Sequence, residues 1–172
     1  MVVAWSKHAG SGFTRALLHM CALLGWPSDF ASWVMACIAF ESAESFSASV
    51  RNQAGSGAVG LIQFMPTTAR GLGTTTEDLE DMSPVAQLVY VQKYFEPYKV
   101  RIRSLADMYM AILMPRYIGA AGDAVIFTDG TAYRQNAGLD ANTDGKITVD
   151  EAADRVRQKL ARGWQPQFGG FV

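Results

Sequence analysis

Serines that can cap a helix, and prolines or glycines that can end one, divide this sequence into short segments with helical periodicity. Four serines stand directly before apolar segments: Ser11, Ser28, Ser83 and Ser104. A serine hydroxyl accepts a hydrogen bond from a free backbone amide of the first helical turn, and glycine or proline stops a helix at its other end. Helices are therefore expected at 12–24, 29–42, 84–96, 105–113 and 149–161. The pattern predicts an all-α protein.

The length of 172 residues fits one domain that spans the whole chain. Residues 1–10 are expected to form a short N-terminal tail. Lys and Arg number 15 against 16 Asp and Glu, so a nucleic-acid partner is not expected. Since the sequence has neither a run of ~20 apolar residues nor a sustained heptad, we expect a monomer without stable membrane insertion.

Two glutamates lie three positions apart in the segment AFESAESF, at the end of the expected helix 29–42. Helical rotation places Glu41 on the apolar stripe that contains Val34 and Cys37, where a leucine would be typical. A carboxyl held against apolar surface has a raised pKa, as a general acid at neutral pH requires. The alternative is a glutamate at the rim of the core, bonded to backbone or to an arginine. Glu44 lies about one turn further on, where the helix is expected to end.

Three sequence segments occur in a distinctive order after the expected helix 12–24. They are ES at 41–42, GAVGLIQFMPTTA at 57–69 and AYRQNAG at 132–138. Glycines let a backbone approach a ligand closely, so the stretch 52–69 is the candidate lip of a cleft. In this order the segments resemble the soluble lytic transglycosylase superfamily, most closely the single-domain muralytic enzymes of phages that infect Gram-negative bacteria. The resemblance covers nearly the whole chain.

This resemblance implies a lysozyme-like helical fold and a phage endolysin that acts on the glycan strands of peptidoglycan. Such an enzyme cleaves the β-1,4 bond between N-acetylmuramic acid and N-acetylglucosamine and uses no organic cofactor. The 6-hydroxyl of the muramic acid attacks its own anomeric carbon, so the product is a 1,6-anhydro sugar. The N-terminal residues lack the basic-then-apolar pattern of a secretory signal. That fits storage in the host cytoplasm until lysis releases the enzyme to the cell wall, and it also fits an enzyme carried in the virion.

The resemblance also implies roles for individual residues. Glu41 is implied as general acid and then base, Gln63 as a residue lining the sugar cleft, and Tyr133 as a residue holding the glycan near the glutamate. Glu44 is the alternative catalytic glutamate, because the glutamate-to-glutamine spacing in the wider superfamily is somewhat shorter. As a neighbour of Glu41, it is otherwise expected to contact substrate.

Three further residues and two other functions stay open. In the wider superfamily tyrosine often stands directly before asparagine, whereas here two residues separate Tyr133 from Asn136. Tyr133 is therefore the residue that the resemblance carries over, and Gln135 and Asn136 remain additional glycan-binding candidates. Tyr117 can stack on a sugar ring, although an aromatic residue beside Pro115 is more often part of the core.

One alternative function is a hydrolytic lysozyme, with water as the nucleophile. The other is a non-catalytic, calcium-dependent glycan-binding module.

The segment DANTDGKITVDE, residues 140–151, matches the twelve-residue calcium loop of an EF-hand position by position. The implied ligands are the side chains of Asp140, Asn142 and Asp144, the carbonyl of Lys146, the hydroxyl of Thr148 or a water on it, and the carboxylate of Glu151. No entering helix is obvious, so a single EF-hand-like loop before the C-terminal helix is expected. The alternative is an acidic turn in which Thr148 and Glu151 form a capping box. A structural calcium ion here would stabilise one wall of the cleft.

Overall fold

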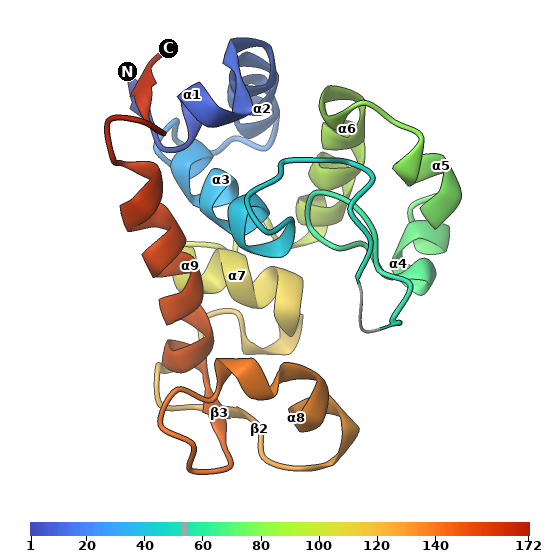
Figure 1. Cartoon of the computed structure of the whole chain (residues 1–172), viewed down its shortest axis with the longest axis vertical. Coiled ribbons are helices and arrows are strands. Elements are labelled where there is room, and N and C mark those ends of the chain that lie inside the picture. The colour runs from blue at the N-terminus through green and yellow to red at the C-terminus, as the bar shows by residue number, and fades with distance from the viewer. Residues whose placement is uncertain (53–54) are drawn as a thin grey trace.

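The computed structural model describes residues 1–52 and 55–172, and helices dominate that part of the chain (Figure 1). The α-helices are α1 (Ser6–Ala9), α2 (Ser11–Leu23), α3 (Phe30–Glu41), α4 (Pro66–Gly71), α5 (Thr76–Glu80), α6 (Pro84–Phe95), α7 (Leu105–Leu113), α8 (Gly130–Asn136) and α9 (Val149–Gly163). Short 3₁₀ helices are η1 (Glu96–Tyr98), η2 (Pro115–Tyr117) and η3 (Ala137–Leu139). The strands are β1 (Val2–Val3), β2 (Val125–Phe127), β3 (Ile147–Thr148) and β4 (Gly170–Phe171).

The expectation of an all-α protein needs one correction, because the strands form two small antiparallel sheets. β1 pairs with β4, and β2 pairs with β3. Each strand has only two or three residues, so neither sheet forms a layer of its own. The protein is predominantly α. None of the helices in the described ranges is long and apolar enough to cross a membrane.

Helix α3 is the centre of the core, where it packs against α2, α7 and α9. Its buried residues surround the helix on nearly all sides: Ala31, Ser32, Val34, Met35, Ala36, Cys37, Ile38 and Ala39. A helix that is apolar all round is one that neighbours cover on every side. The expected picture of a single apolar stripe containing Glu41 was therefore wrong. Glu41 is instead the last residue of a helix whose middle, residues 34–39, is buried on every side.

The expected helix caps were partly right. The hydroxyls of Ser83 and Ser104 accept hydrogen bonds from the third helical amides of α6 and α7, as expected. Gly25, with φ of 72°, ends α2: its amide donates to the Ala22 carbonyl. Ser11 and Ser28, however, cap nothing.

Backbone geometry explains the two failed caps. Gly10, with φ of 87°, joins α1 directly to α2 and occupies the cap position that we expected for Ser11. The chain enters α3 through a tight turn, in which the carbonyls of residues 27–29 accept the amides of residues 30–32. The first amides of α3 are thereby satisfied by backbone, so the hydroxyl of Ser28 is not needed.

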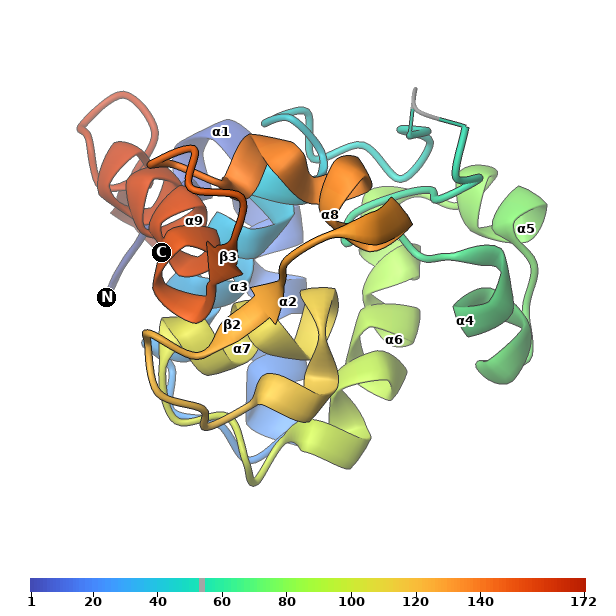
Figure 2. The ribbon, with the colours of Figure 1, turned by 90° about the horizontal axis from the view of Figure 1, so that it is seen from below.

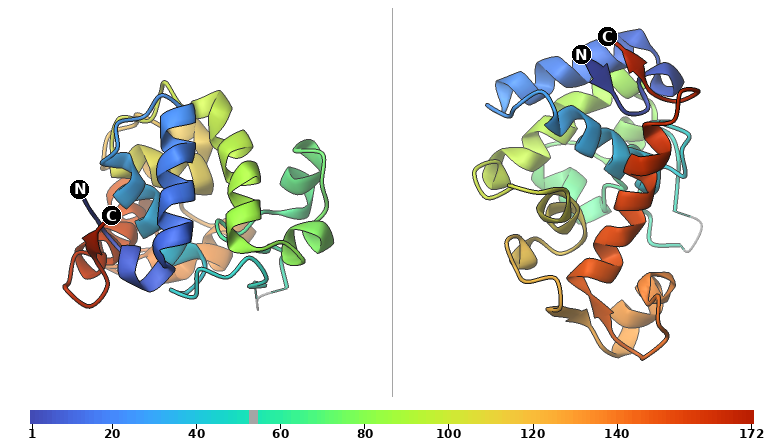
Figure 3. Two further views of the ribbon diagram at one scale, coloured as in Figure 1. Left: turned by 90° about the horizontal axis from the view of Figure 1, so that it is seen from above. Right: turned by 90° about the vertical axis from the view of Figure 1, so that its left-hand side faces the viewer.

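Residues 1–10, expected as a tail, are instead part of the fold. They form β1 and α1, and Val3, Ala4 and Trp5 are fully buried. The indole nitrogen of Trp5 donates to the carbonyl of Lys159 in α9 at 2.9 Å. Figure 3 places the two chain ends side by side, where β1 meets β4. Residues 1–10 join the fold because their apolar side chains can cover the end of α9.

The segment between α3 and α4 is held against α6 by one buried glutamine. Gln87 accepts a hydrogen bond from the amide of Leu61 at 2.7 Å and donates to the carbonyls of Ala48 and Leu79. Gly60, with φ of 86°, passes so close that an added Cβ would lie 2.3 Å from the Gln87 side-chain oxygen. This anchor sets the path of the chain on the side of the molecule where α4 and α5 extend from α6 (Figure 3).

At the end of the molecule away from the two chain termini (Figure 1), α8 and the β2–β3 pair gather around the start of α9 (Figure 2). Helix α8 buries none of its residues, whereas Leu139 in η3 and Ile147 in β3 belong to the core. The loop 140–151 connects η3 to β3 and to the first turn of α9. Contrary to expectation, a short helical segment, α8 followed by η3, does precede this loop.

Candidate functional site

A cavity of about 490 Å³ opens at the C-terminal end of α3. Helices α3, α7 and α9, the α8–η3 segment and the loop after α3 all contribute to it. Its lining residues are Phe40, Glu41, Asn52, Tyr109, Leu113, Gln135, Asn136, Gly138, Leu139 and Arg155. Polar and charged side chains make up half of this lining and apolar or aromatic ones most of the rest, so the cavity offers both hydrogen-bonding groups and apolar surface to a ligand. We call this the α3 cavity.

Glu41 sits where the buried helix α3 meets the α3 cavity. Burial raises the pKa of Glu41 from 4.5 to about 7, and a side-chain hydrogen bond from Tyr109 opposes part of that rise. At neutral pH about half of the Glu41 carboxyls therefore have a proton to give. A titratable group in this state, facing a cavity, has the properties of a general acid.

Tyr109 of α7 fixes the position of that carboxyl. The ring of Tyr109 is buried and packs edge-on against Phe40, with ring centroids 5.5 Å apart. Its hydroxyl has nearby Glu41 as a hydrogen-bond partner, and burial, together with the Glu41 charge, raises the pKa of Tyr109 well above 10. Tyr109 therefore stays a neutral hydrogen-bond donor to Glu41 over the whole accessible pH range.

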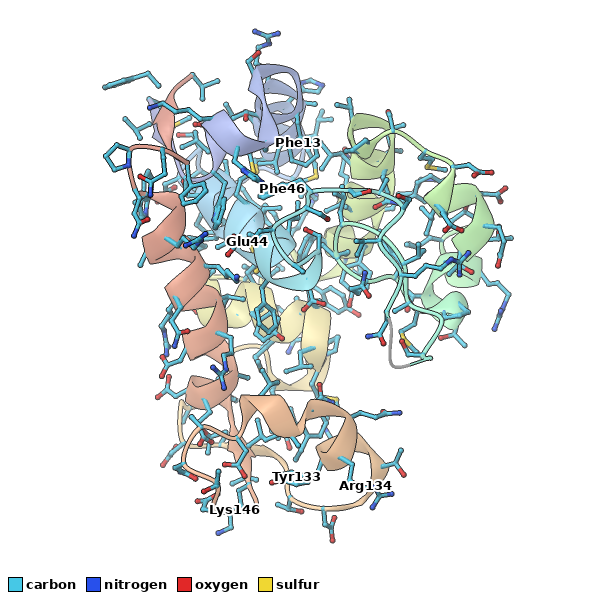
Figure 4. All side chains as sticks on the ribbon, in the orientation of Figure 1. Phe13, Glu44, Phe46, Tyr133, Arg134 and Lys146 are labelled. Atoms are coloured by element: carbon cyan, nitrogen blue, oxygen red, sulfur yellow. The ribbon has the colours of Figure 1, made fainter. Side chains whose placement is uncertain are left out.

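Glu44 lies elsewhere, on the side of α9 (Figure 4). Its carboxylate forms ion pairs with Lys159 and, at 3.1 Å, with Arg162. Partial burial alone would raise the pKa of Glu44, but the hydrogen bonds and positive charges of Lys159 and Arg162 outweigh it and lower the pKa. Glu44 does not line the α3 cavity. It is thus an ionised residue that ties the end of α3 to α9.

Gln63, Tyr117 and Tyr133 also lie outside the lining of the α3 cavity. The Gln63 amide donates to the carbonyls of Val50 and Gly60, at 3.2 and 3.1 Å, and so braces its own loop. The Tyr117 hydroxyl donates to the carbonyl of Val125 at 2.9 Å, and its ring packs against the core.

Tyr133 turns from α8 toward the loop 140–151 and donates to Asp140 Oδ2 at 2.7 Å (Figure 4). Gln135 and Asn136, two and three residues later, line the α3 cavity instead. The structure therefore brings Glu41 together with Gln135 and Asn136, and it places Tyr133 beside the loop 140–151.

Sequence reasoning missed Tyr109 and Arg155. Each sits on a helix whose pattern looked merely amphipathic, and nothing local sets them apart. The one available signal for Tyr109 was that a tyrosine on an apolar helix face needs a partner for its hydroxyl. In the candidate lip 52–69, Asn52 lines the cavity, while residues 53–54 lie outside the described residues.

The backbone of the loop 140–151 makes the turns that the EF-hand loop template requires. The Asp140 carboxylate accepts the amide of Gly145 at 3.0 Å, and Gly145 has φ of 82°, as the sixth position requires. Asn142 and Asp144 each accept an amide two residues further on, both at 2.9 Å. Ile147, at the apolar eighth position, is fully buried in β3.

The expected ligand Thr148 has another role, because it forms a reciprocal capping box with Glu151. The Thr148 amide and hydroxyl both donate to Glu151 Oε2, at 2.9 Å each. The capping-box alternative is thus present in the structure. It uses only one oxygen of Glu151, and so leaves the other oxygen for a second role.

Two buried carboxylate oxygens bear on whether the loop 140–151 can bind a cation. Among the described side chains, Asp140 Oδ1 and Glu151 Oε1 are buried without a hydrogen-bond partner. Within residues 1–52 and 55–172, no three His, Cys, Asp or Glu side chains converge as a metal cluster. The calcium-loop template, however, also relies on an amide and a backbone carbonyl. The two carboxylate oxygens without a hydrogen-bond partner stand at the first and last positions of this template, where a hard cation such as calcium takes its ligands.

Comparison of the chain with family models, curated proteins and solved structures found no match.

Proposed function

We propose that this protein is a peptidoglycan lytic transglycosylase with a lysozyme-like fold, of the kind that phages use as endolysins. The observation that supports this most is the raised pKa of Glu41, which lines a cavity of about 490 Å³. The ordered segments that resemble the soluble lytic transglycosylase superfamily supply the substrate class. Under this proposal the enzyme acts on the cell wall after release at lysis.

The proposed reaction uses one glutamate twice. Protonated Glu41 gives its proton to the glycosidic oxygen, and the bond between that oxygen and the muramic anomeric carbon breaks as an oxocarbenium-like centre develops. The Glu41 carboxylate then takes the proton of the muramic 6-hydroxyl, whose oxygen bonds to the anomeric carbon. The products are a 1,6-anhydro end and a free 4-hydroxyl, and Glu41 is protonated again.

The charged groups around the α3 cavity agree with that scheme. Of the described residues that line it, Glu41 is the single carboxylate. Glycosidases that use an enzymatic nucleophile or a base for water need a second carboxylate at roughly 5–10 Å. Attack by the substrate's own hydroxyl needs none. Gln135 and Asn136 offer amides to the sugar hydroxyl and acetamido groups, and Arg155 offers a positive charge.

Turnover of purified peptidoglycan by Glu41→Gln, Glu44→Gln and the wild type tests the proposal. Glutamine keeps the shape of glutamate and removes the transferable proton. We expect Glu41→Gln to lose at least about a hundredfold in rate, a typical contribution of general acid catalysis. Glu44→Gln is the matched control, since it changes the same residue type outside the cavity and should keep near-normal turnover.

Full activity of Glu41→Gln would refute the proposed role of Glu41. Loss of activity in Glu44→Gln alone, with its fold confirmed by circular dichroism, would move the catalytic role to Glu44. No turnover by the wild type on stripped cells, together with glycan binding, would favour the non-catalytic binding module.

A further inference from the structure

We infer that the loop 140–151 binds a calcium ion and that this ion holds the α8–η3 wall of the α3 cavity against α9. The binding itself is independent of the proposed function. Its consequence for glycan cleavage rests on that function.

The ligands for the ion come from the loop and from the first turn of α9. Asp140, at the first position, is 7% exposed and its Oδ1 has no partner. Glu151, at the twelfth position, likewise has a buried and unpartnered Oε1. A buried carboxylate oxygen without a partner is costly, and a hard cation is the natural partner for two of them.

The remaining oxygens of the template are positioned by hydrogen bonds that leave a lone pair or a second oxygen for an ion. Asp144 accepts the Lys146 amide with Oδ1, which leaves its other oxygen for coordination. Asn142 is held in the same way by the amide of Asp144. The backbone carbonyl of Lys146 completes the set. This mixture of carboxylate, amide and carbonyl oxygens is typical of calcium rather than magnesium, which demands a tighter octahedron with more water.

The ion would join two elements that form the same wall of the α3 cavity. Asp140 follows η3 directly, and Glu151 stands in the first turn of α9. One helical turn after Glu151, the Arg155 guanidinium donates to the carbonyl of Gly138 at 2.5 Å. Arg155 and Gly138 both line the α3 cavity. An ion between Asp140 and Glu151 would therefore add a second link between η3 and α9.

Within this wall, α8 needs such a link because it buries none of its own residues. No residue of α8 is buried, although Gln135 and Asn136 of this helix line the α3 cavity. The contact of α8 with the loop is the hydrogen bond from Tyr133 to Asp140, the first ligand position. Segments with few buried contacts open at low free-energy cost, and fixing Asp140 would suppress that opening.

Binding is tested first, without substrate. At calcium a hundredfold above its dissociation constant, we expect the melting temperature to exceed that in chelator by about 5–10 °C. Equal magnesium should give a much smaller shift. Terbium in place of calcium should emit on excitation of tyrosine, because Tyr133 adjoins the site, and Tyr133→Phe should lose most of that emission. Unchanged melting with no terbium emission would overturn the site.

Three variants separate the ion from ordinary loop stability. Glu151→Gln keeps the capping box, which accepts glutamine as well as glutamate, and removes the ligand charge. Asp140→Asn keeps an acceptor for Gly145 and Tyr133. Both should abolish the calcium-dependent shift. The matched control is Asp150→Asn, at the eleventh and non-ligating position, where the exposed side chain pairs with Arg157. It should keep the full shift.

Hydrogen exchange at residues 133–139 tests the coupling to the wall. Saturating calcium should slow exchange there by up to about a hundredfold in the wild type and leave it unchanged in Glu151→Gln. A calcium-dependent rise in melting temperature without slower exchange at residues 133–139 would show that calcium binds but does not hold the α8–η3 wall. If the coupling holds and the proposed function is also right, chelator should raise the KM for peptidoglycan. An inactive wild type with normal calcium responses would count against the proposed function alone.

Discussion

Replacement of Glu41 by glutamine should make the protein more stable at pH 8 while it abolishes turnover. The folded protein holds the Glu41 proton more tightly than the unfolded chain does, because burial raises the pKa from 4.5 to about 7. The contribution of this proton to the free energy of unfolding is therefore fully present below pH 4.5. It falls as the pH rises toward 7, because the unfolded chain has already lost the proton there. Glutamine stays neutral throughout and avoids that loss.

The size of this effect follows from the pKa shift of Glu41. A rise from 4.5 to about 7 corresponds to about 3 kcal/mol at pH 8, which would move the melting temperature by about 6–12 °C in a chain of this size. Urea unfolding of Glu41→Gln and the wild type at pH 8 and pH 4 measures it directly. We expect a gain for the variant at pH 8 and near parity at pH 4. Parity at both values, or the same gain at both, would refute the claim that Glu41 is desolvated.

Three further variants test particular contacts. Tyr109→Phe removes a hydrogen bond that lowers the pKa of Glu41, so the alkaline limb of the pH–rate profile should move to higher pH. A move of this limb to lower pH would contradict the hydrogen bond between Tyr109 and Glu41. Glu44→Gln should keep its activity and lose at most about 1 kcal/mol, because its ion pairs with Lys159 and Arg162 are partly exposed, and added salt should shrink the difference seen in urea melts. Gly60→Ala should cost about 2 kcal/mol or more, since a Cβ at φ of 86° collides with the buried Gln87, and an unchanged unfolding midpoint would show that the loop can move aside.

Local chemistry predicted the longer helices α2, α3, α6, α7 and α9, and it missed the short helices α4, α5 and α8. Ser83 and Ser104 cap their helices because the chain enters both in extended conformation. Ser11 fails because Gly10 joins two helices without a gap. The first ten residues were misjudged as a tail, since only the folded chain reveals that Trp5 fills a space beside α9.

The candidate site was predictable in part. Glu41 was selected by a helical-phase argument that fails, because the middle of α3 is buried on every side. Its raised pKa is nevertheless what the apolar surroundings implied. Tyr133 could not be placed from sequence, since its hydroxyl has a carboxylate partner seven residues later that competes with any ligand. Tyr109 and Arg155 reach the α3 cavity only through tertiary packing of α7 and α9. The loop 140–151 was the feature most easily read from the sequence, because all the ligands proposed for it are contiguous.

The most direct test of the proposed function is the mass of the muropeptides that the wild type releases from purified peptidoglycan, measured beside those from Glu41→Gln. Intramolecular attack predicts 1,6-anhydro products, lighter by one water than hydrolysis products and without a reducing end, and none of them from the variant. Reducing-end products from the wild type would instead indicate a hydrolytic lysozyme on the same cavity, and equal product from both proteins would contradict the role of Glu41 altogether.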